Sequence, residues 1–433
     1  MDRYKMAWGA VLGNALMNRP DAAAQASKAS AERGLGPVMA GKDSGWIDNE
    51  MKGSLGRLLF VVSEDWYFCS HRLPVARAAR DAGFEVYVAT RVHEHRKCIE
   101  QEGFQVLPIK MRRGSFNPIM EVASVMELTR LYRKIRPHIV HHVALKPVLQ
   151  GGVALRLAGV PVSANAIAGL GHVFSSRGVR AQVLKFAVGR ALKILLSRPG
   201  TAVIAQNPDD VEVLRRDVGL ATTSIVLVRG SGVDTEHFRP GTRDAGIPTI
   251  TMVSRMLWAK GVGVLAEAAA ILRKRGVAVR VVLVGAPDPE NPGSVPAEVL
   301  QQWHADGLLD WRGKCSAVEE IWRASDIAVL PSHYGEGVPK SLLEAAACGL
   351  PIITTDMPGC REVVTNGQNG LLIAPRDPVG LADAMEKLAS DPALCQQMGK
   401  ASRLRAEAEY SERLVQEATL KVYERLLSGI ALR

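Results

Sequence analysis

Residues 327–356 read IAVLPSHYGEGVPKSLLEAAACGLPIITTD. The apolar runs 327–332 and 351–356 predict two buried strands, and the segment PKSLLEAAAC between them predicts a helix. Pro339 suits the first turn of that helix, because a proline there loses no hydrogen bond. Gly349 suits the position after the C-cap, where the backbone turns left-handed. The stretch therefore indicates a strand–loop–helix–strand unit, from which parallel sheets are built.

The same alternation of short apolar runs and longer amphipathic runs continues along the chain. Further strands are predicted at 57–62, 85–90, 105–109, 139–143, 161–167, 201–207, 249–254, 279–285, 309–313 and 370–375. Between the two series, residues 229–248 hold four glycines and two prolines without apolar periodicity, which indicates an inter-domain linker. We therefore expect an α/β fold of two facing Rossmann-like domains, with ligands bound in a cleft at the carboxyl ends of the strands.

The predicted boundaries divide the chain into four parts. Residues 1–50 lack the apolar run of a secretory signal and are interpreted as an extension outside the fold, with Met51 as a natural start. Residues 51–235 form the first predicted domain and residues 236–410 the second. Residues 411–433 are predicted to be a C-terminal helix, for which packing back on the first domain stays open.

The composition is that of an ordinary globular protein. The chain has 433 residues, of which 47% are hydrophobic and 23% charged, so extensive disorder is not expected. Its six cysteines include no CxxC pair, which favours reduced thiols over a disulfide framework or a zinc site. No run of about 18 apolar residues occurs, so no transmembrane helix is predicted.

Positive charge is concentrated in the first half of the chain. Residues 51–230 hold 26 Lys and Arg against 13 Asp and Glu, whereas residues 231–433 hold 22 against 25. The basic half suits an anionic membrane face or a phosphorylated acceptor, with a solvated surface that has no dedicated partner as the alternative. Nucleic acid is not expected as a partner, because aromatic residues make up only 5% and do not interleave with the basic ones.

Two acids and two cations in the second half are candidates for chemistry. Glu336 lies in the loop before the predicted helix and Glu344 one or two turns into it, so the two carboxylates can hold two hydroxyl-rich parts of one ligand. Arg255 and Lys260, in SRMLWAKGV (254–262), follow a buried strand and can clamp a diphosphate. Taken alone, each pair also fits a solvated surface or an acid favoured by the helix dipole.

Together these segments resemble the donor half of glycosyltransferase family 4. The resemblance rests on R-x4-K at Arg255 and Lys260, E-x7-E at Glu336 and Glu344, A-x-G-x-P at 347–351 and Pro-Gly-x-x-Glu at 358–362. It runs from about residue 57 to the C-terminus and is stronger in the second half. It implies the GT-B fold, which consists of two Rossmann-like domains.

The resemblance also implies a role for each donor-side side chain. Arg255 and Lys260 would bind the donor diphosphate. Glu336 would contact the hydroxyls of the donor sugar, and Glu344 those of the ribose. Glu336, Arg255 and Lys260 are therefore the candidate catalytic residues. Transfer with retention of anomeric configuration, without a metal or a cofactor, is implied in the same way.

The donor loop carries a local departure from the family pattern. The backbone of Gly337, Val338 and Pro339 would line the sugar and the phosphate, although Pro339 has no N–H to donate. Many family members have E-G-F-G at this place, whereas this chain has E-G-V-P. That variant resembles the subgroup that works on lipopolysaccharide and capsule intermediates.

The first half is predicted to bind the acceptor. Where many family members have a Gly-Gly turn, this chain has SEDWYFCSHR (63–72), which again resembles the polysaccharide subgroup. The candidates for acceptor or cleft contacts are Lys146, Gly169, Gly171, His172, His71 and Arg72. The last two also suit helix capping or the surface. His141 and His142 point to opposite faces of a strand, so at most one of them can face a ligand.

Two basic segments of the first half are candidates for contact with a membrane or with phosphates. Residues 179–196 form a basic amphipathic helix that can rest on an anionic bilayer, or can be an ordinary helix whose Lys and Arg reach solvent. Residues 110–118, KMRRGSFNP, form a basic loop that can meet acceptor phosphates.

The sequence thus predicts a glycosyltransferase for hexose or N-acetylhexosamine. We expect a nucleotide-sugar donor, of UDP type, and a polyprenyl-diphosphate-linked glycan as acceptor in cell-surface polysaccharide biosynthesis. The predicted location is cytoplasmic, on the inner face of the cytoplasmic membrane. The alternatives are a GT-B nucleotide-sugar epimerase and a non-enzymatic protein that binds nucleotides or polyanions.

Overall fold

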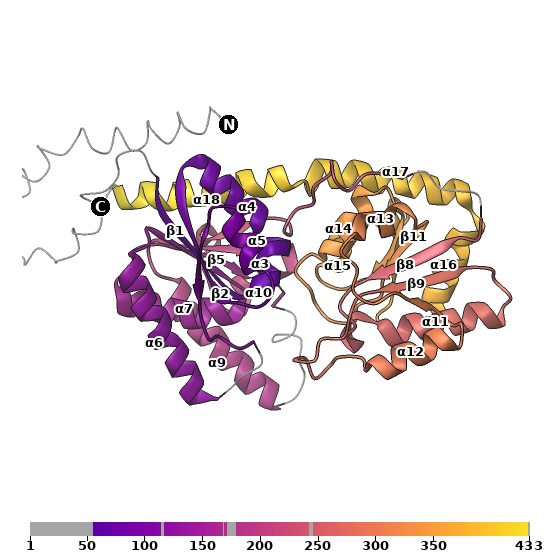
Figure 1. Cartoon of the computed structure of the whole chain (residues 1–433), viewed down its shortest axis with the longest axis horizontal. Helices are drawn as coiled ribbons and strands as arrows, with labels where there is room; N and C mark the ends of the chain where they lie inside the picture. Colours follow the sequence, from indigo (N-terminus) through magenta and orange to yellow (C-terminus); the bar gives the residue numbers. More distant parts are fainter. Residues whose placement is uncertain (1–54, 114–116, 168, 171–178, 242–245, 432–433) are drawn as a thin grey trace, which may run out of the picture. The chain divides into compact units, whose positions relative to one another are not determined.

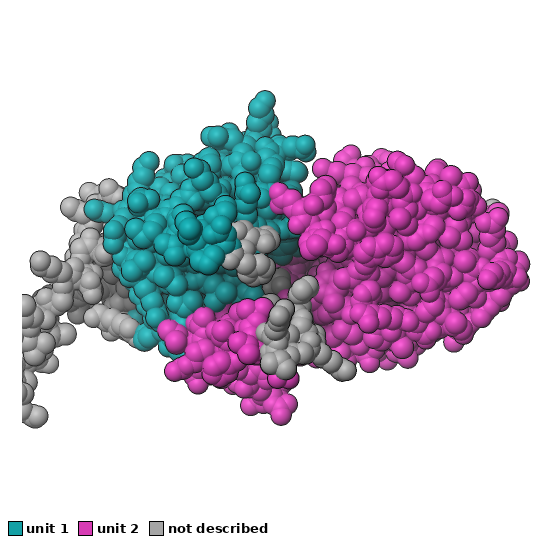
Figure 2. All heavy atoms as spheres, turned by 90° about the horizontal axis from the view of Figure 1, so that it is seen from below, with its two compact units in different colours: residues 1–165, 195–202, 419–433 teal, residues 166–194, 203–418 magenta. Residues whose placement is uncertain are grey.

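The computed structural model of the chain describes residues 55–113, 117–167, 169–170, 179–241 and 246–431. It divides into two compact units (Figure 1 and Figure 2). Unit 1 takes its residues from 1–165, 195–202 and 419–433, and unit 2 takes its residues from 166–194 and 203–418. The predicted extension 1–50 lies outside the described residues. The stretch 229–248, predicted as a linker, lies within unit 2.

The first half of the chain forms a seven-stranded sheet with the order β3-β2-β1-β4-β5-β6-β7. Its strands are β1 (Gly56–Glu64), β2 (Phe84–Arg91), β3 (Gln105–Pro108), β4 (Ile139–Val143), β5 (Ser163–Ile167), β6 (Thr201–Ala205) and β7 (Ile225–Leu227). Strand β1 pairs in parallel with both β2 and β4. The order of the strands therefore reverses between β1 and β4, which is where open α/β sheets bind ligands.

Helices connect these strands. They are α3 (Asp65–His71), α4 (Leu73–Ala82), α5 (Arg96–Gln101), α6 (Pro118–Ile135), α7 (Leu145–Ala158), α9 (Val179–Leu196) and α10 (Pro208–Arg216), with a short 3-10 turn η2 (Thr222–Ser224). Helices α6 and α7 pack side by side (Figure 1). Leu128 and Tyr132 of α6 meet Leu59 and Val61 of β1 in one buried apolar cluster. Burial of this cluster is the main stabilising contribution to that layer.

The second half forms a six-stranded parallel sheet with the order β10-β9-β8-β11-β12-β13. Its strands are β8 (Thr249–Val253), β9 (Arg280–Val284), β10 (Asp310–Trp311), β11 (Ile327–Leu330), β12 (Ile352–Thr355) and β13 (Gly370–Ile373). The order runs outward in both directions from β8 and β11. The carboxyl ends of these two neighbours therefore flank the switch point of this sheet.

The helices of the second half belong to unit 2, except for the later part of the last one. They are α11 (Val262–Lys274), α12 (Ala297–Ala305), α13 (Val318–Arg323), α14 (Lys340–Ala347), α15 (Cys360–Val363), α16 (Pro378–Ser390), α17 (Pro392–Glu409) and α18 (Glu412–Ala431), with a 3-10 turn η3 (Trp258–Lys260). Helix α11 packs beside α16, and α14 packs beside α17. Helix α18 contributes its first residues to unit 2 and residues from 419 onward to unit 1.

All twelve strands predicted from the sequence are present, with ends shifted by zero to two residues. Strand β7 is not predicted, because three residues are too few to show a period. Pro339 lies at the N-cap of α14, one residue before the helix, while Gly349 follows the C-cap Cys348 with φ 69° as predicted. Among the described residues, no helix combines the length and the apolar character needed to cross a membrane.

Candidate functional site

The loop between β11 and α14 places Glu336 beside Lys260. The Glu336 carboxylate forms an ion pair with the Lys260 ammonium, and the two side chains are 9% and 13% exposed. The other carboxylate oxygen of Glu336 is buried and accepts no hydrogen bond among the described residues. A carboxylate with one oxygen held by a cation and the other unused is suited to accept hydrogen bonds from ligand hydroxyls.

Lys260 reaches this place because the turn before α11 lies against the loop that follows β11. Gly261 has φ 83°, and a Cβ on it would lie 2.1 Å from the carbonyl oxygen of Pro331, so only glycine permits the close approach. Burial lowers the pKa of Lys260, but the Glu336 carboxylate and Tyr334 outweigh it and leave the pKa raised. The ammonium therefore stays charged at neutral pH.

Tyr334 and Cys360 lie beside the Lys260–Glu336 ion pair. The Lys260 nitrogen lies 5.6 Å from the centre of the Tyr334 ring, in a cation–π contact. Burial, with the Glu336 carboxylate, raises the pKa of the Tyr334 hydroxyl and raises the pKa of the Cys360 thiol to about 12. Both groups are therefore neutral at physiological pH, and the charges of the site are those of Lys260 and Glu336.

Arg255 follows β8, and its guanidinium forms an ion pair of 2.7 Å with Asp288. The Arg255 side chain is 39% exposed. Its charge acts on both Lys260 and Tyr334, so it belongs to the same electrostatic cluster. Asp288 was not singled out in the sequence, because a single acid in a Pro-rich loop gives no local signal.

Glu344 lies in the second turn of α14 and has a different environment. Burial raises the pKa of its carboxyl to about 7, opposed by the Lys340 cation and the Trp322 indole. Protonated and ionised forms of Glu344 are therefore both populated near neutral pH. Hydroxyl groups of a ligand that donate hydrogen bonds to it would favour the ionised form.

Asn207 and Asp210, which the sequence analysis did not select, hold the backbone of the Glu336 loop. The Asn207 amide donates to the carbonyl oxygens of Glu336 at 3.1 Å and Gly337 at 2.9 Å. Asp210 accepts from the Asn207 amide at 3.0 Å and from the N–H groups of Gly169 and Leu170. The local signal was an Asn-Pro-Asp-Asp sequence after a strand, which is typical of a helix start.

The predicted acceptor residues of unit 1 that the structure describes each have their own contacts. Lys146 forms an ion pair of 2.7 Å with Glu121 and donates to the carbonyl oxygen of Arg112. The His71 ring stacks on Tyr67 with ring centres 4.2 Å apart. Arg72 is buried, at 2% exposure, in the interior of unit 1.

The predicted glycine turn after β5 is described only in part. Gly169 has φ 73°, and a Cβ there would approach the nitrogen of Gly337 at 3.2 Å, so this glycine lies against the donor loop within unit 2. Gly171 and His172 lie outside the described residues.

His141 and His142 are both fully buried. His141 pairs with Tyr423 of α18, and His142 pairs with Tyr132 and Asn165. Burial lowers the pKa of each imidazole, to about 4 for His142. Both therefore act as neutral structural groups.

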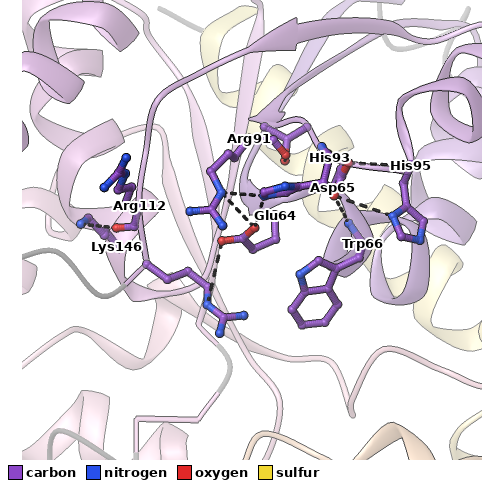
Figure 3. Close-up of polar contacts among 10 residues, drawn as sticks. Glu64, Asp65, Trp66, Arg91, His93, His95, Arg112 and Lys146 are labelled. Atoms are coloured by element: carbon purple, nitrogen blue, oxygen red, sulfur yellow. Dashed lines mark hydrogen bonds and ion pairs between the residues drawn. The ribbon is translucent and has the colours of Figure 1, made fainter. Parts of the chain in front are cut away.

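A charged cluster at the carboxyl ends of β1 and β2 was also missed (Figure 3). Glu64, 2% exposed, lies 3.4 Å from both Arg91 and His93. Asp65 accepts from the N–H groups of His93 at 2.6 Å and His95 at 3.1 Å. Two acids directly after a buried strand were the available signal.

No group of three or more potential metal-binding His, Cys, Asp or Glu occurs in the part of the chain that the structure describes.

Two family models match the chain. The model described as glycosyl transferase 4-like matches residues 57–207, and the model described as glycosyl transferases group 1 matches residues 247–391. The chain belongs to glycosyltransferase family 4. The family-4 motifs R-x4-K and E-x7-E thus lie on Arg255, Lys260, Glu336 and Glu344, of which Lys260 and Glu336 are in direct contact.

Two curated relatives of this family-4 enzyme are named for substrates linked to undecaprenyl diphosphate. The N,N'-diacetylbacillosaminyl-diphospho-undecaprenol alpha-1,3-N-acetylgalactosaminyltransferase of Campylobacter jejuni is 27% identical, over 83% of this chain and 96% of that protein. The UDP-Gal:alpha-D-GlcNAc-diphosphoundecaprenol alpha-1,3-galactosyltransferase of Escherichia coli is 27% identical, over 64% of this chain and 72% of that protein.

A solved structure confirms the GT-B fold of this family-4 glycosyltransferase. HepE of Anabaena, in complex with UDP and glucose, is 16% identical and superposes with a TM-score of 0.68, over 85% of this chain and 99% of that one.

Proposed function

We propose that the chain transfers a hexose or N-acetylhexosamine from a UDP-sugar to a polyprenyl-diphosphate-linked glycan during cell-surface polysaccharide biosynthesis. The observation that carries the proposal is the Lys260–Glu336 pair, whose second carboxylate oxygen is buried and accepts no hydrogen bond among the described residues. The names of the two curated relatives support the lipid-linked acceptor, and one of them names a UDP-sugar.

In this proposal, each donor-side residue binds one part of the nucleotide-sugar. Lys260 and Arg255 offset the negative charge of the diphosphate, with Arg255 exchanging part of its contact with Asp288 for a phosphoryl oxygen. Glu336 accepts hydrogen bonds from hydroxyls of the sugar. Glu344 accepts them from the ribose.

The reaction breaks the bond between the anomeric carbon and the diphosphate oxygen and forms a bond from that carbon to an acceptor hydroxyl oxygen. The proton of the acceptor hydroxyl passes to the departing diphosphate, so no external base is needed. The new bond forms on the face that the diphosphate leaves, which retains the anomeric configuration. Lys260 stabilises the charge that develops on the leaving group.

We further propose that the enzyme is peripherally bound to the cytoplasmic face of the membrane. On α9, the side chains of Val183, Phe186 and Ile194 are exposed and lie on one helical face. Phe186 is 76% exposed, Arg190 shares its face, and the described part of the helix carries no acid. Exposed apolar groups flanked by cations suit the interface of an anionic bilayer.

The test is a transfer assay with a panel of UDP-sugars and a short-chain polyprenyl diphosphate bearing one N-acetylhexosamine. The proposal predicts a product heavier by one sugar residue, with the anomeric configuration of the donor by NMR. Epimerisation of the UDP-sugar without acceptor would support the epimerase instead. Nucleotide binding without any turnover across the panel would support a binding protein.

A further inference from the structure

The donor loop is held from behind by a side chain that the family motifs do not include. Asn207 follows β6 at the N-cap of α10 and is fully buried. Its amide nitrogen donates to two consecutive carbonyl oxygens, those of Glu336 and Gly337. Asn207, the loop and all their contacts described below belong to unit 2.

The orientation of the Asn207 amide is fixed by Asp210. The backbone N–H of Asp210 donates to the Asn207 oxygen at 2.7 Å, so the nitrogen faces the loop. The Asp210 carboxylate, 3% exposed, accepts from that nitrogen at 3.0 Å. It also accepts from the N–H groups of Gly169 and Leu170. These hydrogen bonds therefore hold the Asn207 amide in a single orientation.

The carbonyl oxygens are also enclosed from the other side. Gly359 has φ 80°, and a Cβ on it would lie 2.0 Å from the Gly337 oxygen and 2.5 Å from the Glu336 oxygen. The N–H of Glu336 is bound to the carbonyl oxygen of Pro358 at 3.0 Å. The loop backbone thus has little freedom to rotate its peptide planes.

The fixed carbonyl groups of Glu336 and Gly337 also fix the orientation of the two N–H groups that follow them. In a trans peptide the C=O and the following N–H point in opposite directions. Since the carbonyls of Glu336 and Gly337 point to Asn207, the N–H groups of Gly337 and Val338 point away from it. No acceptor takes either N–H among the described residues. Gly169 has no side chain to cover the Gly337 nitrogen, since a Cβ there would lie 3.2 Å from it.

We propose that Asn207 is a positioning residue that directs the N–H groups of Gly337 and Val338 toward the phosphoryl oxygens of the donor diphosphate. Asp210 acts through Asn207 by fixing its amide. The inference rests on the proposed function, because it takes a nucleoside diphosphate as the ligand. Two fixed N–H groups and the Lys260 ammonium then stabilise the leaving diphosphate together.

Asn207→Ser separates this role from the capping of α10. Serine is a good N-cap and can still accept from the Asp210 N–H, but it has no amide to hold the two carbonyls. We expect kcat to fall about tenfold, because two hydrogen bonds to the loop are lost. The KM for the acceptor should stay within about twofold, because the acceptor makes no contact with this loop in the proposal.

Asn369→Ser is the matched control. Asn369 is also a buried amide of unit 2, which accepts from the N–H of Thr365 and donates to the carbonyl oxygen of Val363 at 2.9 Å. Among the described residues, the Asn369 side chain bonds to Thr365, Val363 and Ser402 and not to the Glu336 loop. It should lower thermal stability about as much as Asn207→Ser and leave kcat unchanged. A kcat of Asn207→Ser within twofold of the wild type would overturn the inference, whereas a wild type without turnover would count against the proposed function.

Hydrogen exchange tests the inference without turnover. In a peptide that spans 335–340, Pro339 carries no amide, so Gly337 and Val338 supply a large share of the signal. UDP should slow the exchange of this peptide in the wild type and slow it much less in Asn207→Ser. Equal protection by UDP in both proteins, or none in the wild type, would overturn the inference.

Discussion

Replacing Glu344 by glutamine should change how the stability of the protein depends on pH. The carboxyl has an ordinary pKa of 4.5 when the chain is unfolded and a pKa of about 7 when folded. The folded state therefore holds a proton that the unfolded state has lost between these values. Stability is highest at the acidic end of this window and falls as the pH rises toward 7.

The size of the effect follows from the displacement of the pKa. Over the full window, protonation of Glu344 contributes at most about 3 kcal/mol to the free energy of unfolding. About 2 kcal/mol of this contribution is lost between pH ~5.5 and ~8. Glutamine keeps the size of the side chain and cannot ionise. The free energy of unfolding of Glu344→Gln relative to the wild type should therefore rise by about 2 kcal/mol from pH ~5.5 to ~8.

The assay is urea unfolding of both proteins at the two pH values, followed by tryptophan fluorescence, to which Trp322 beside Glu344 contributes. Glu267→Gln controls for the loss of one carboxylate, because Glu267 is exposed on α11 of the same unit. A difference between Glu344→Gln and the wild type that stays constant with pH would refute the argument that burial governs this carboxyl.

Three further predictions concern the donor loop and the membrane. Lys260→Met should lower the free energy of unfolding by about 3–5 kcal/mol, because it leaves the Glu336 carboxylate buried without its cation. Adding Glu336→Gln to this variant should restore most of the lost stability, and calorimetry that shows no such rescue would contradict the ion pair. Gly359→Ala should destabilise the protein far more than Gly276→Ala, because both glycines have positive φ but only at Gly359 would the new Cβ collide with the loop, and equal melting temperatures would contradict this. Phe186→Ser should reduce cosedimentation of the protein with anionic vesicles and leave turnover on a detergent-solubilised acceptor unchanged. Unaltered vesicle binding would count against α9 as the membrane contact.

The fold, and the placement of Lys260 and Glu336 after strands of one sheet, were predictable from the sequence because their signals are local. Each strand is a short apolar run, and each of the two motifs begins within four residues of the end of a predicted strand. Parallel strands that end at the same edge of a sheet then bring Lys260 and Glu336 together. Burial and pairing of the individual side chains could not be predicted in this way.

The contacts that the sequence did not reveal are long-range or depend on burial. Asn207 lies 129 residues from Glu336 along the chain, so no local pattern connects them. Arg72 stands in a short polar segment at a helix start, which gives no indication that the side chain is enclosed. The pKa of Glu344 is raised by burial and lowered by the contact with Trp322, which lies 22 residues earlier in the chain.

The most direct test of the donor-site assignment is turnover of Glu336→Gln measured together with its affinity for UDP. Because the Glu336 carboxylate is proposed to hold the sugar and not the nucleotide, kcat should fall at least about a hundredfold while the Kd for UDP changes less than about threefold. Transfer by Glu336→Gln at the wild-type rate would contradict the assignment of the Lys260–Glu336 pair as the site of the donor sugar.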